Sequence, residues 1–168
     1  MIRPAPAVGD TSGVASGGEH RGVVGLLTSL CRELVASPGG DGCLASRVIG
    51  DVLIGIADYA PDGRTLQLGH GYLASDYPET KLVLETREPR CLSLSDDDVD
   101  PGEAEILRAL GFESLAMLPL EAVGQVWALI EIYRVGAAFT DEELEVAAAT
   151  VGRFARLLDE LLAGPASG

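Results

Sequence analysis

Two neighbouring segments of the chain decide the fold: FESLAMLPL at residues 112–120 and QVWALIEIYR at residues 125–134. Both segments are strongly apolar, and each is short enough to be one strand. Only residues 121–124, Glu-Ala-Val-Gly, separate them, which is typical of a tight connection between antiparallel strands. The sequence therefore predicts an antiparallel hairpin in the middle of a sheet.

Further strands are predicted upstream of this hairpin. Residues 52–57 form a nearly continuous apolar run with β-branched side chains, which indicates an inner strand. Residues 64–72 follow the turn Pro61-Asp62-Gly63 and alternate along the chain, so we expect a second strand paired with the first. The alternation places Leu66, Leu68, His70 and Tyr72 on one face. Residues 91–95 are predicted to form a short third strand.

Helices are predicted where apolar residues recur at three- and four-residue spacing. We expect them at residues 23–35, 44–49, 78–87, 101–110 and 141–162. Asp100, Pro101 and Glu103 have the pattern of a capping box with proline in the first turn, and Gly111 supplies the stop. Thr140 and Glu143 form the same capping pattern at the start of the last helix.

The chain has the size and composition of one domain with flexible ends. It has 168 residues, of which 47% are hydrophobic. Residues 1–21 and 164–168 are rich in Gly, Ala, Ser and Pro, so we expect a disordered N-terminal tail, a folded domain at residues 22–163 and a flexible C-terminal tail. The net charge of -14 disfavours binding to nucleic acid or to an anionic membrane.

The cysteines and the hydropathy pattern indicate the compartment. Cys31, Cys43 and Cys91 are widely spaced and odd in number, so they form neither a disulfide framework nor a metal-binding pair. No apolar run reaches the ~20 residues of a membrane span, and no signal peptide is evident. We therefore expect a cytoplasmic protein. The acidic run 96–100 lacks the pattern of a calcium loop and is interpreted as a solvated loop that ends in a helix cap.

The last predicted helix carries two interleaved seven-residue series. The positions are Leu144, Ala147, Val151, Phe154, Leu158 and Leu161. Such a seam is typical of a helical dimer interface, and a homodimer is predicted on this basis. The same stripe also suits packing of the helix on the sheet of its own chain.

Several segments together resemble a GAF domain of the type found in bacterial signalling proteins. They are Asp76-Tyr77-Pro78-Glu79-Thr80, Arg87-Glu88-Pro89, Gly111 to Leu120 and Phe139-Thr140-Asp141-Glu142-Glu143-Leu144. The resemblance implies an α+β fold in which an antiparallel sheet of five or six strands carries the first and last helices on one face. It also implies a ligand pocket on the other face, roofed by residues 76–111.

The family does not name a ligand, because its members bind different molecules or none. The lysine and phenylalanine pattern of cyclic-nucleotide-binding members is broken here at Thr80-Lys81 and Phe139. Bilin attachment uses a cysteine followed by histidine, and neither His20 nor His70 follows a cysteine. The cofactor is therefore unknown, and no metal site is predicted.

Strand alternation selects the candidate pocket residues. Trp127, Leu129, Glu131 and Tyr133 are predicted to share one face of their strand. Glu131 is expected either to accept hydrogen bonds from a ligand or from Tyr72 and Tyr77, or to face the helices and pair with Arg153 or Arg156. The full candidate set is His70, Tyr72, Tyr77, Thr80, Cys91, Phe112, Ser114, Trp127, Glu131 and Tyr133.

Three functions compete at this point. The first is a non-catalytic sensory domain that binds a small molecule and signals through helices to a partner protein or a linked output domain. The second is a ligand-free interaction or dimerisation module. The third is an enzyme similar to free methionine sulfoxide reductases, which needs paired reactive cysteines, and only Cys91 is a candidate. No catalytic residue is predicted.

Overall fold

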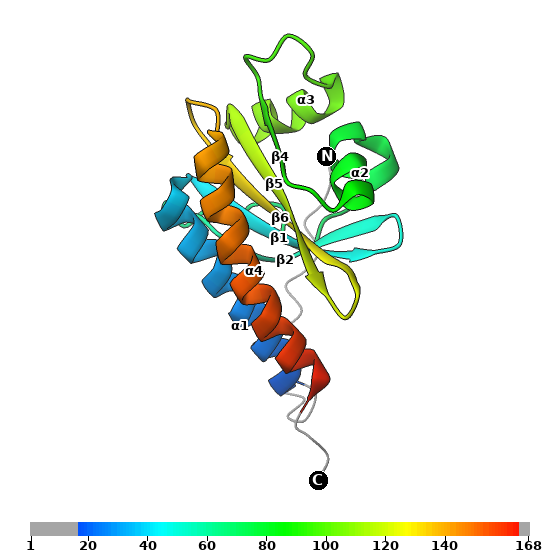
Figure 1. Cartoon of the computed structure of the whole chain (residues 1–168). Helices are drawn as coiled ribbons and strands as arrows, with labels where there is room; N and C mark the ends of the chain where they lie inside the picture. Colours follow the sequence, from blue (N-terminus) through cyan, green and yellow to red (C-terminus); the bar gives the residue numbers. More distant parts are fainter. Residues whose placement is uncertain (1–16, 165–168) are drawn as a thin grey trace.

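The centre of the protein is one antiparallel sheet. In the computed structural model, which describes residues 17–164 (Figure 1), six strands lie in the order β3-β2-β1-β6-β5-β4. Every neighbouring pair of strands is antiparallel. The strands are β1 (Gly42–Ile49), β2 (Val52–Tyr59), β3 (Gly71–Leu73), β4 (Arg90–Ser93), β5 (Ser114–Ala122) and β6 (Gln125–Arg134).

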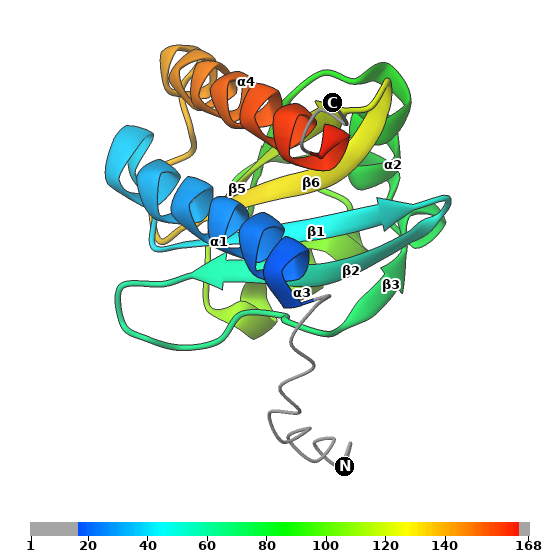
Figure 2. The same ribbon diagram turned by 90° about the horizontal axis from the view of Figure 1, so that it is seen from below.

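Helices cover both faces of the sheet and divide the fold into three layers. The long helices α1 and α4 run side by side on one face, while α2 and α3 lie on the other (Figures 1 and 2). The helical elements are α1 (Gly17–Leu34), η1 (Val35–Gly39), η2 (Ala74–Asp76), α2 (Pro78–Thr86), α3 (Pro101–Leu110) and α4 (Asp141–Ala163). The predicted α+β fold is confirmed. None of the helices within residues 17–164 is both long and apolar enough to cross a membrane.

The first helix begins earlier than the sequence indicates. α1 starts at Gly17, inside the segment 1–21 that is predicted to be a disordered tail. The rest of that predicted tail, residues 1–16, and residues 165–168 of the predicted C-terminal tail lie outside the described residues.

The elements with strong local signals form as predicted. β5 and β6 make the central hairpin, and their connection is closed by Val123 and Gly124 at positive φ angles of 48° and 75°. The Asp100 side chain accepts a hydrogen bond from the backbone of Glu103 and caps α3, while Gly111 ends that helix in the left-handed region. Thr140 and Glu143 form a complete capping box at the start of α4.

Two predicted elements are wrong. Residues 44–49, predicted as a helix, belong to strand β1, because a short apolar run buried on both faces has no periodicity that separates the two structures. Residues 64–70, predicted as a strand, form a loop with one isolated bridge from Leu68 to Gly55, and the strand that pairs with β2 is limited to residues 71–73. The proposed shared face of Leu66, Leu68, His70 and Tyr72 therefore does not exist.

Gly55 of β2 explains the path of this loop. The backbone N–H of Gly69 donates to the carbonyl oxygen of Gly55 at 2.9 Å. A Cβ atom at position 55 would lie 2.5 Å from the carbonyl oxygen of Gln67, so only glycine allows this approach. The carboxylate of Asp58 accepts a hydrogen bond from the backbone N–H of Leu66 at 2.7 Å and holds the start of this loop against β2.

The two faces of the sheet bury separate apolar clusters. We call the cluster between the sheet and α1 and α4 the helix-side core; its largest members are Leu27, Leu30, Leu34, Leu118, Leu120, Trp127, Ile130, Ile132, Phe139, Phe154 and Leu158. We call the cluster under α2 and α3 the cavity-side core; its largest members are Leu44, Leu53, Leu66, Leu107, Phe112, Leu115, Met117, Leu129 and Tyr133. Alternation along β5 and β6 supplies both clusters from the same strands.

Candidate functional site

The cavity-side core encloses a hollow of about 190 Å³ between the sheet and the two short helices. This volume is smaller than the roughly 300–1,000 Å³ of pockets for drug-sized ligands. The walls are formed by Gln67, His70, Gly71, Tyr72, Tyr77, Thr80, Glu103, Ile106, Leu107, Leu115, Glu131 and Tyr133. Because α2 and α3 provide its upper wall, the roof predicted at residues 76–111 lies where expected.

Glu131 forms the polar floor of the cavity. It lies in the middle of β6, and only 7% of its surface is exposed. The phenol of Tyr133 donates to Oε2 at 2.6 Å, and the phenol of Tyr72 donates to Oε1 at 3.0 Å. Of the two predicted alternatives, Glu131 faces the tyrosines, with Tyr72 as a donor as expected and Tyr133 in place of Tyr77. Arg153, the proposed partner on the helix side, pairs with Glu33 instead.

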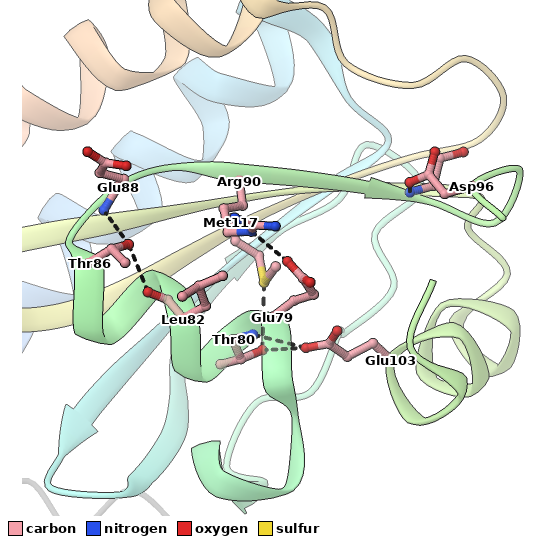
Figure 3. A network of polar contacts seen from close by, with 10 residues as sticks. Glu79, Thr80, Leu82, Thr86, Glu88, Arg90, Asp96, Glu103 and Met117 are labelled. Carbon is pink, nitrogen blue, oxygen red and sulfur yellow. Dashed lines mark hydrogen bonds and ion pairs between the residues drawn. The ribbon is translucent and has the colours of Figure 1, made fainter. Parts of the chain in front are cut away.

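A second buried carboxylate lies in the roof. Glu103 of α3 is 5% exposed, and its Oε1 accepts from the backbone N–H of Thr80 at 3.0 Å and from the Thr80 hydroxyl at 3.2 Å. The same hydroxyl approaches the sulfur of Met117 on β5 at 3.6 Å, so Thr80 joins both helices of the roof to the sheet (Figure 3). The other carboxylate oxygen of Glu103, Oε2, is buried and has no hydrogen-bond partner among the described residues.

Burial changes the acid strength of these groups. Loss of hydration raises the pKa of Glu131, and the two phenol hydrogen bonds offset only part of that rise. Loss of hydration also raises the pKa of Glu103 against the hydrogen bonds from Thr80. Burial and the neighbouring carboxylate of Glu131 raise the pKa of Tyr133, so its phenol keeps its proton and remains a donor.

Aromatic rings and a loop complete the walls. The rings of Tyr72 and Tyr77 meet edge to face, with their centroids 5.3 Å apart. Gln67 and His70 lie on the loop that packs against Gly55, and the side chain of His70 is exposed. The walls contain two carboxylates and neither lysine nor arginine. Within residues 17–164 no group of three or more His, Cys, Asp or Glu side chains is arranged to hold a metal ion.

Six of the predicted site residues meet at the cavity: His70, Tyr72, Tyr77, Thr80, Glu131 and Tyr133. Phe112 lies behind the wall, where its ring stacks on Tyr133 with centroids 5.0 Å apart. Ser114 is the first residue of β5, and its hydroxyl donates to the carbonyl oxygen of Gly136 at 2.9 Å. Neither Phe112 nor Ser114 is part of the cavity surface.

Trp127 lies on the other side of the sheet, so the predicted shared face with Glu131 is wrong. The pairing of β5 with β6 shifts between Leu120 and Glu121, and Trp127 is the extra residue at this bulge. It packs in the helix-side core together with its neighbour Ala128. The guanidinium of Arg47 covers its ring at 4.1 Å from the centroid.

The cysteines also lie away from the cavity. Cys91 of β4 packs against the helix-side core, which corrects the expectation that it faces the pocket. Burial raises the pKa of its thiol to about 11, which disfavours the reactive thiolate. Cys31 and Cys43 are fully buried in the helix-side core, and burial raises the pKa of Cys43 as well.

Sequence reasoning missed half of the cavity wall, most importantly Glu103. Its place in the Asp100 capping pattern suggested a role at the helix terminus, but only the Asp100 half of that pattern forms. A signal was present, because Ile106 and Leu107 follow Glu103 at helical spacing and place it on the buried face of α3. The other missed residues are Gln67, Gly71, Ile106, Leu107 and Leu115.

The predicted dimer seam is largely occupied by contacts within the chain. Ala147, Val151, Phe154 and Leu158 are buried in the helix-side core, and Leu144 packs against it. Leu161 of α4 is exposed, as are four further apolar side chains on α1 and α4. These four are Val24, Val146, Leu157 and Leu162.

Comparison with known proteins places the fold. The sequence profile described as "GAF domain" matches residues 23–158. A search of curated proteins finds no significant match. Among solved structures, the phycocyanobilin-bound GAF domain from a cyanobacterial phytochrome is 21% identical, with a TM-score of 0.68, over 80% of this chain and 82% of that one.

Two further structures have the same architecture. The blue-light absorbing form of the Thermosynechococcus elongatus PixJ GAF domain is 14% identical, with a TM-score of 0.72, over 86% of this chain and 89% of that one. The GAF domain/HD domain protein from Geobacter sulfurreducens is 15% identical, with a TM-score of 0.70, over 86% of this chain and 96% of that one. The profile match and the roofed antiparallel sheet agree: this chain belongs to the GAF domain family.

Proposed function

We propose that the protein is a non-catalytic sensory GAF domain of the cytoplasm that binds a small molecule in the cavity between β6, α2 and α3. The observation that carries this proposal is the burial of two carboxylates, Glu103 and Glu131, in the wall of one hollow. Buried carboxylates destabilise a fold unless they are paired or neutralised, so their presence there is best explained by a ligand.

The roof provides a route for the signal. Thr80 and Glu103 link α2 to α3, and the contact between Thr80 and Met117 links both helices to β5. A ligand that contacts Glu103 would tighten this link and change how firmly the roof is ordered against the sheet. The opposite face of the same strands carries α1 and α4, which would pass the change to a partner protein or to a linked output domain.

A dimer through α1 and α4 is part of this proposal. The heptad residues are used within the chain, so the dimer surface would consist of the exposed apolar side chains that remain on the two helices. Those side chains are Val24, Val146, Leu157, Leu161 and Leu162. The same surface supports the second candidate function, an interaction module that binds no ligand.

The covalent-chromophore and enzyme alternatives have little support in this chain. The phytochrome neighbour is bound to phycocyanobilin, but the hollow here is about 190 Å³, and His70 follows Gly69 rather than a cysteine. A sulfoxide reductase needs reactive thiols in the pocket, whereas Cys31, Cys43 and Cys91 belong to the helix side.

Native mass spectrometry of protein purified from its source tests the proposal. We expect a dimer that retains a small-molecule adduct. The variant Ile106→Phe, which fills the cavity, should lose the adduct, while Arg108→Phe on the exposed side of the same helix should keep it. A dimer without adduct in the wild type would favour the interaction module.

A further inference from the structure

We propose that the cavity ligand is a small organic cation, a protonated primary or secondary amine whose N–H groups are held by Glu103 and by the group of Glu131, Tyr72 and Tyr133. This inference rests on the sensing function proposed above and names the chemical class that the cavity accepts.

The first argument is charge. Glu103 and Glu131 take part in none of the ion pairs among the described residues, although both are more than nine-tenths buried. The cavity wall has no lysine or arginine that could neutralise them. Two buried carboxylates without a cation are costly, and a bound ammonium group supplies the missing charge.

The second argument is the unpartnered oxygen of Glu103. Both donors of Thr80 are directed to Oε1, which leaves Oε2 buried and without a hydrogen bond among the described residues. A buried acceptor without a donor destabilises the fold by about 1–3 kcal/mol. An N–H group of a ligand in the cavity satisfies this oxygen, and a charged N–H does so most strongly.

The third argument is the direction of the hydrogen bonds around Glu131. The phenol protons of Tyr72 and Tyr133 are both committed to its carboxylate. On this side of the cavity, two phenol oxygens and the carboxylates of Glu131 and Glu103 therefore offer lone pairs to a ligand, while the wall residues that can donate are Gln67, His70 and Tyr77. Tyr72 and Tyr77 also line the cavity, and aromatic rings attract cations. A ligand with N–H donors matches the side of the wall that holds Glu103 and Glu131, and a phosphate or carboxylate does not.

The net charge of the protein also favours a cationic ligand over an anionic one. A chain with a formal charge of -14 concentrates cations near its surface and repels anions. The hollow of about 190 Å³ limits the size of the cation to a short aliphatic or single-ring amine.

A matched set of small probes tests the inference by thermal shift and isothermal titration calorimetry. The set consists of n-butylammonium, 1,4-diaminobutane, tetramethylammonium, butyrate and butanamide. We expect the first two to raise Tm and bind, and butyrate and butanamide to do neither. Tetramethylammonium, which has no N–H, should bind at least about tenfold more weakly than n-butylammonium, because it cannot satisfy Glu103 Oε2.

Two variants test whether binding of the amine depends on Glu103. Glu103→Gln keeps the shape and the acceptor for Thr80 but removes the charge, and it should weaken binding of n-butylammonium by about 10- to 100-fold. Glu113→Gln removes the same charge from an exposed position and should leave binding unchanged. Tm of each unliganded variant shows that it is folded.

The outcomes separate this inference from the sensing function. Binding of butyrate or butanamide without binding of either amine overturns the cation class and leaves the cavity as a sensor. Amine binding that survives Glu103→Gln overturns the role of Glu103. If no probe of any charge binds and native mass spectrometry shows no adduct, both the cation class and the sensing function are wrong.

Discussion

The two faces of the sheet are built from the same strands but differ in their packing and in the polar groups that they bury. On the helix side, β5 and β6 contribute small and aliphatic side chains and Trp127 to the packing against α1 and α4, and no buried carboxylate belongs to this cluster. On the cavity side, the alternate residues of β6 are Leu129, Glu131 and Tyr133, and a hollow remains. The difference indicates that the helix side is packed for stability, whereas the cavity side carries polar groups around a space that is not filled by side chains.

Removing a helix-side leucine is expected to have the largest effect. Leu158→Ala deletes a fully buried side chain of α4 and should lower the free energy of unfolding by about 2–5 kcal/mol, since the packed core cannot close the space. Urea unfolding measures the change. Leu157→Ala, one position away and 42% exposed, is the control and should change stability by less than about 0.5 kcal/mol. Equal losses at the two positions would contradict the assignment of faces.

A smaller loss is expected where the cavity wall meets the sheet. Gly55→Ala places a Cβ atom against the backbone of Gln67 and should destabilise the fold by about 1–3 kcal/mol, because the loop must move. The movement displaces Gln67 and His70, so binding of any cavity ligand should weaken too. Gly152→Ala in α4 meets open space and should instead stabilise by about 0.5–1 kcal/mol. Urea unfolding of both variants checks the opposite signs.

The comparison also explains what the sequence can and cannot predict. The hairpin 112–134 and the caps of α3 and α4 are encoded by residues close to each other in the chain, so they are predictable. The loop 64–70 alternates like a strand, but its path is set by Gly55 and Asp58 on another strand. Such long-range contacts leave no local pattern.

The cavity was predictable in part for the same reason. Glu131 and Tyr133 follow from simple alternation in β6, and Thr80 and Tyr77 from the family resemblance. Trp127 was misplaced because the bulge opposite Leu120 reverses its side, and a bulge of this kind has no clear sequence signal. Glu103 is not predicted as a cavity residue because the capping pattern with Asp100 already accounts for a glutamate at this position.

The unpaired carboxylate in the roof predicts an unusual dependence on pH. Because the pKa of Glu103 is raised above its ordinary value of 4.5, its stabilising contribution is present below pH 4.5 and is lost as the pH rises through the raised value. Glu103→Gln should match the wild type at pH 4 and be more stable at pH 8 by up to about 1 kcal/mol. Urea unfolding at both pH values measures this. A variant less stable than the wild type at pH 8 would mean that the charge is compensated without a ligand.

A carboxylate on the helix side should show the opposite sign and the smallest effect. Arg134 donates to both oxygens of Glu143, and this contact lowers the pKa of Glu143 to about 2. Its contribution is therefore present above pH 4.5 and is lost as the pH falls towards 2. Since the pair is partly exposed, Glu143→Gln should cost at most about 1 kcal/mol at pH 7 and progressively less as the pH falls to 2, where about half of the Glu143 carboxyl groups keep their charge. Thermal unfolding across this range checks the crossing of the two pH profiles: the Glu103 variant gains relative stability with rising pH, while the Glu143 variant loses it. Parallel pH profiles of the two variants would show that the pKa values of Glu103 and Glu143 are not shifted in opposite directions.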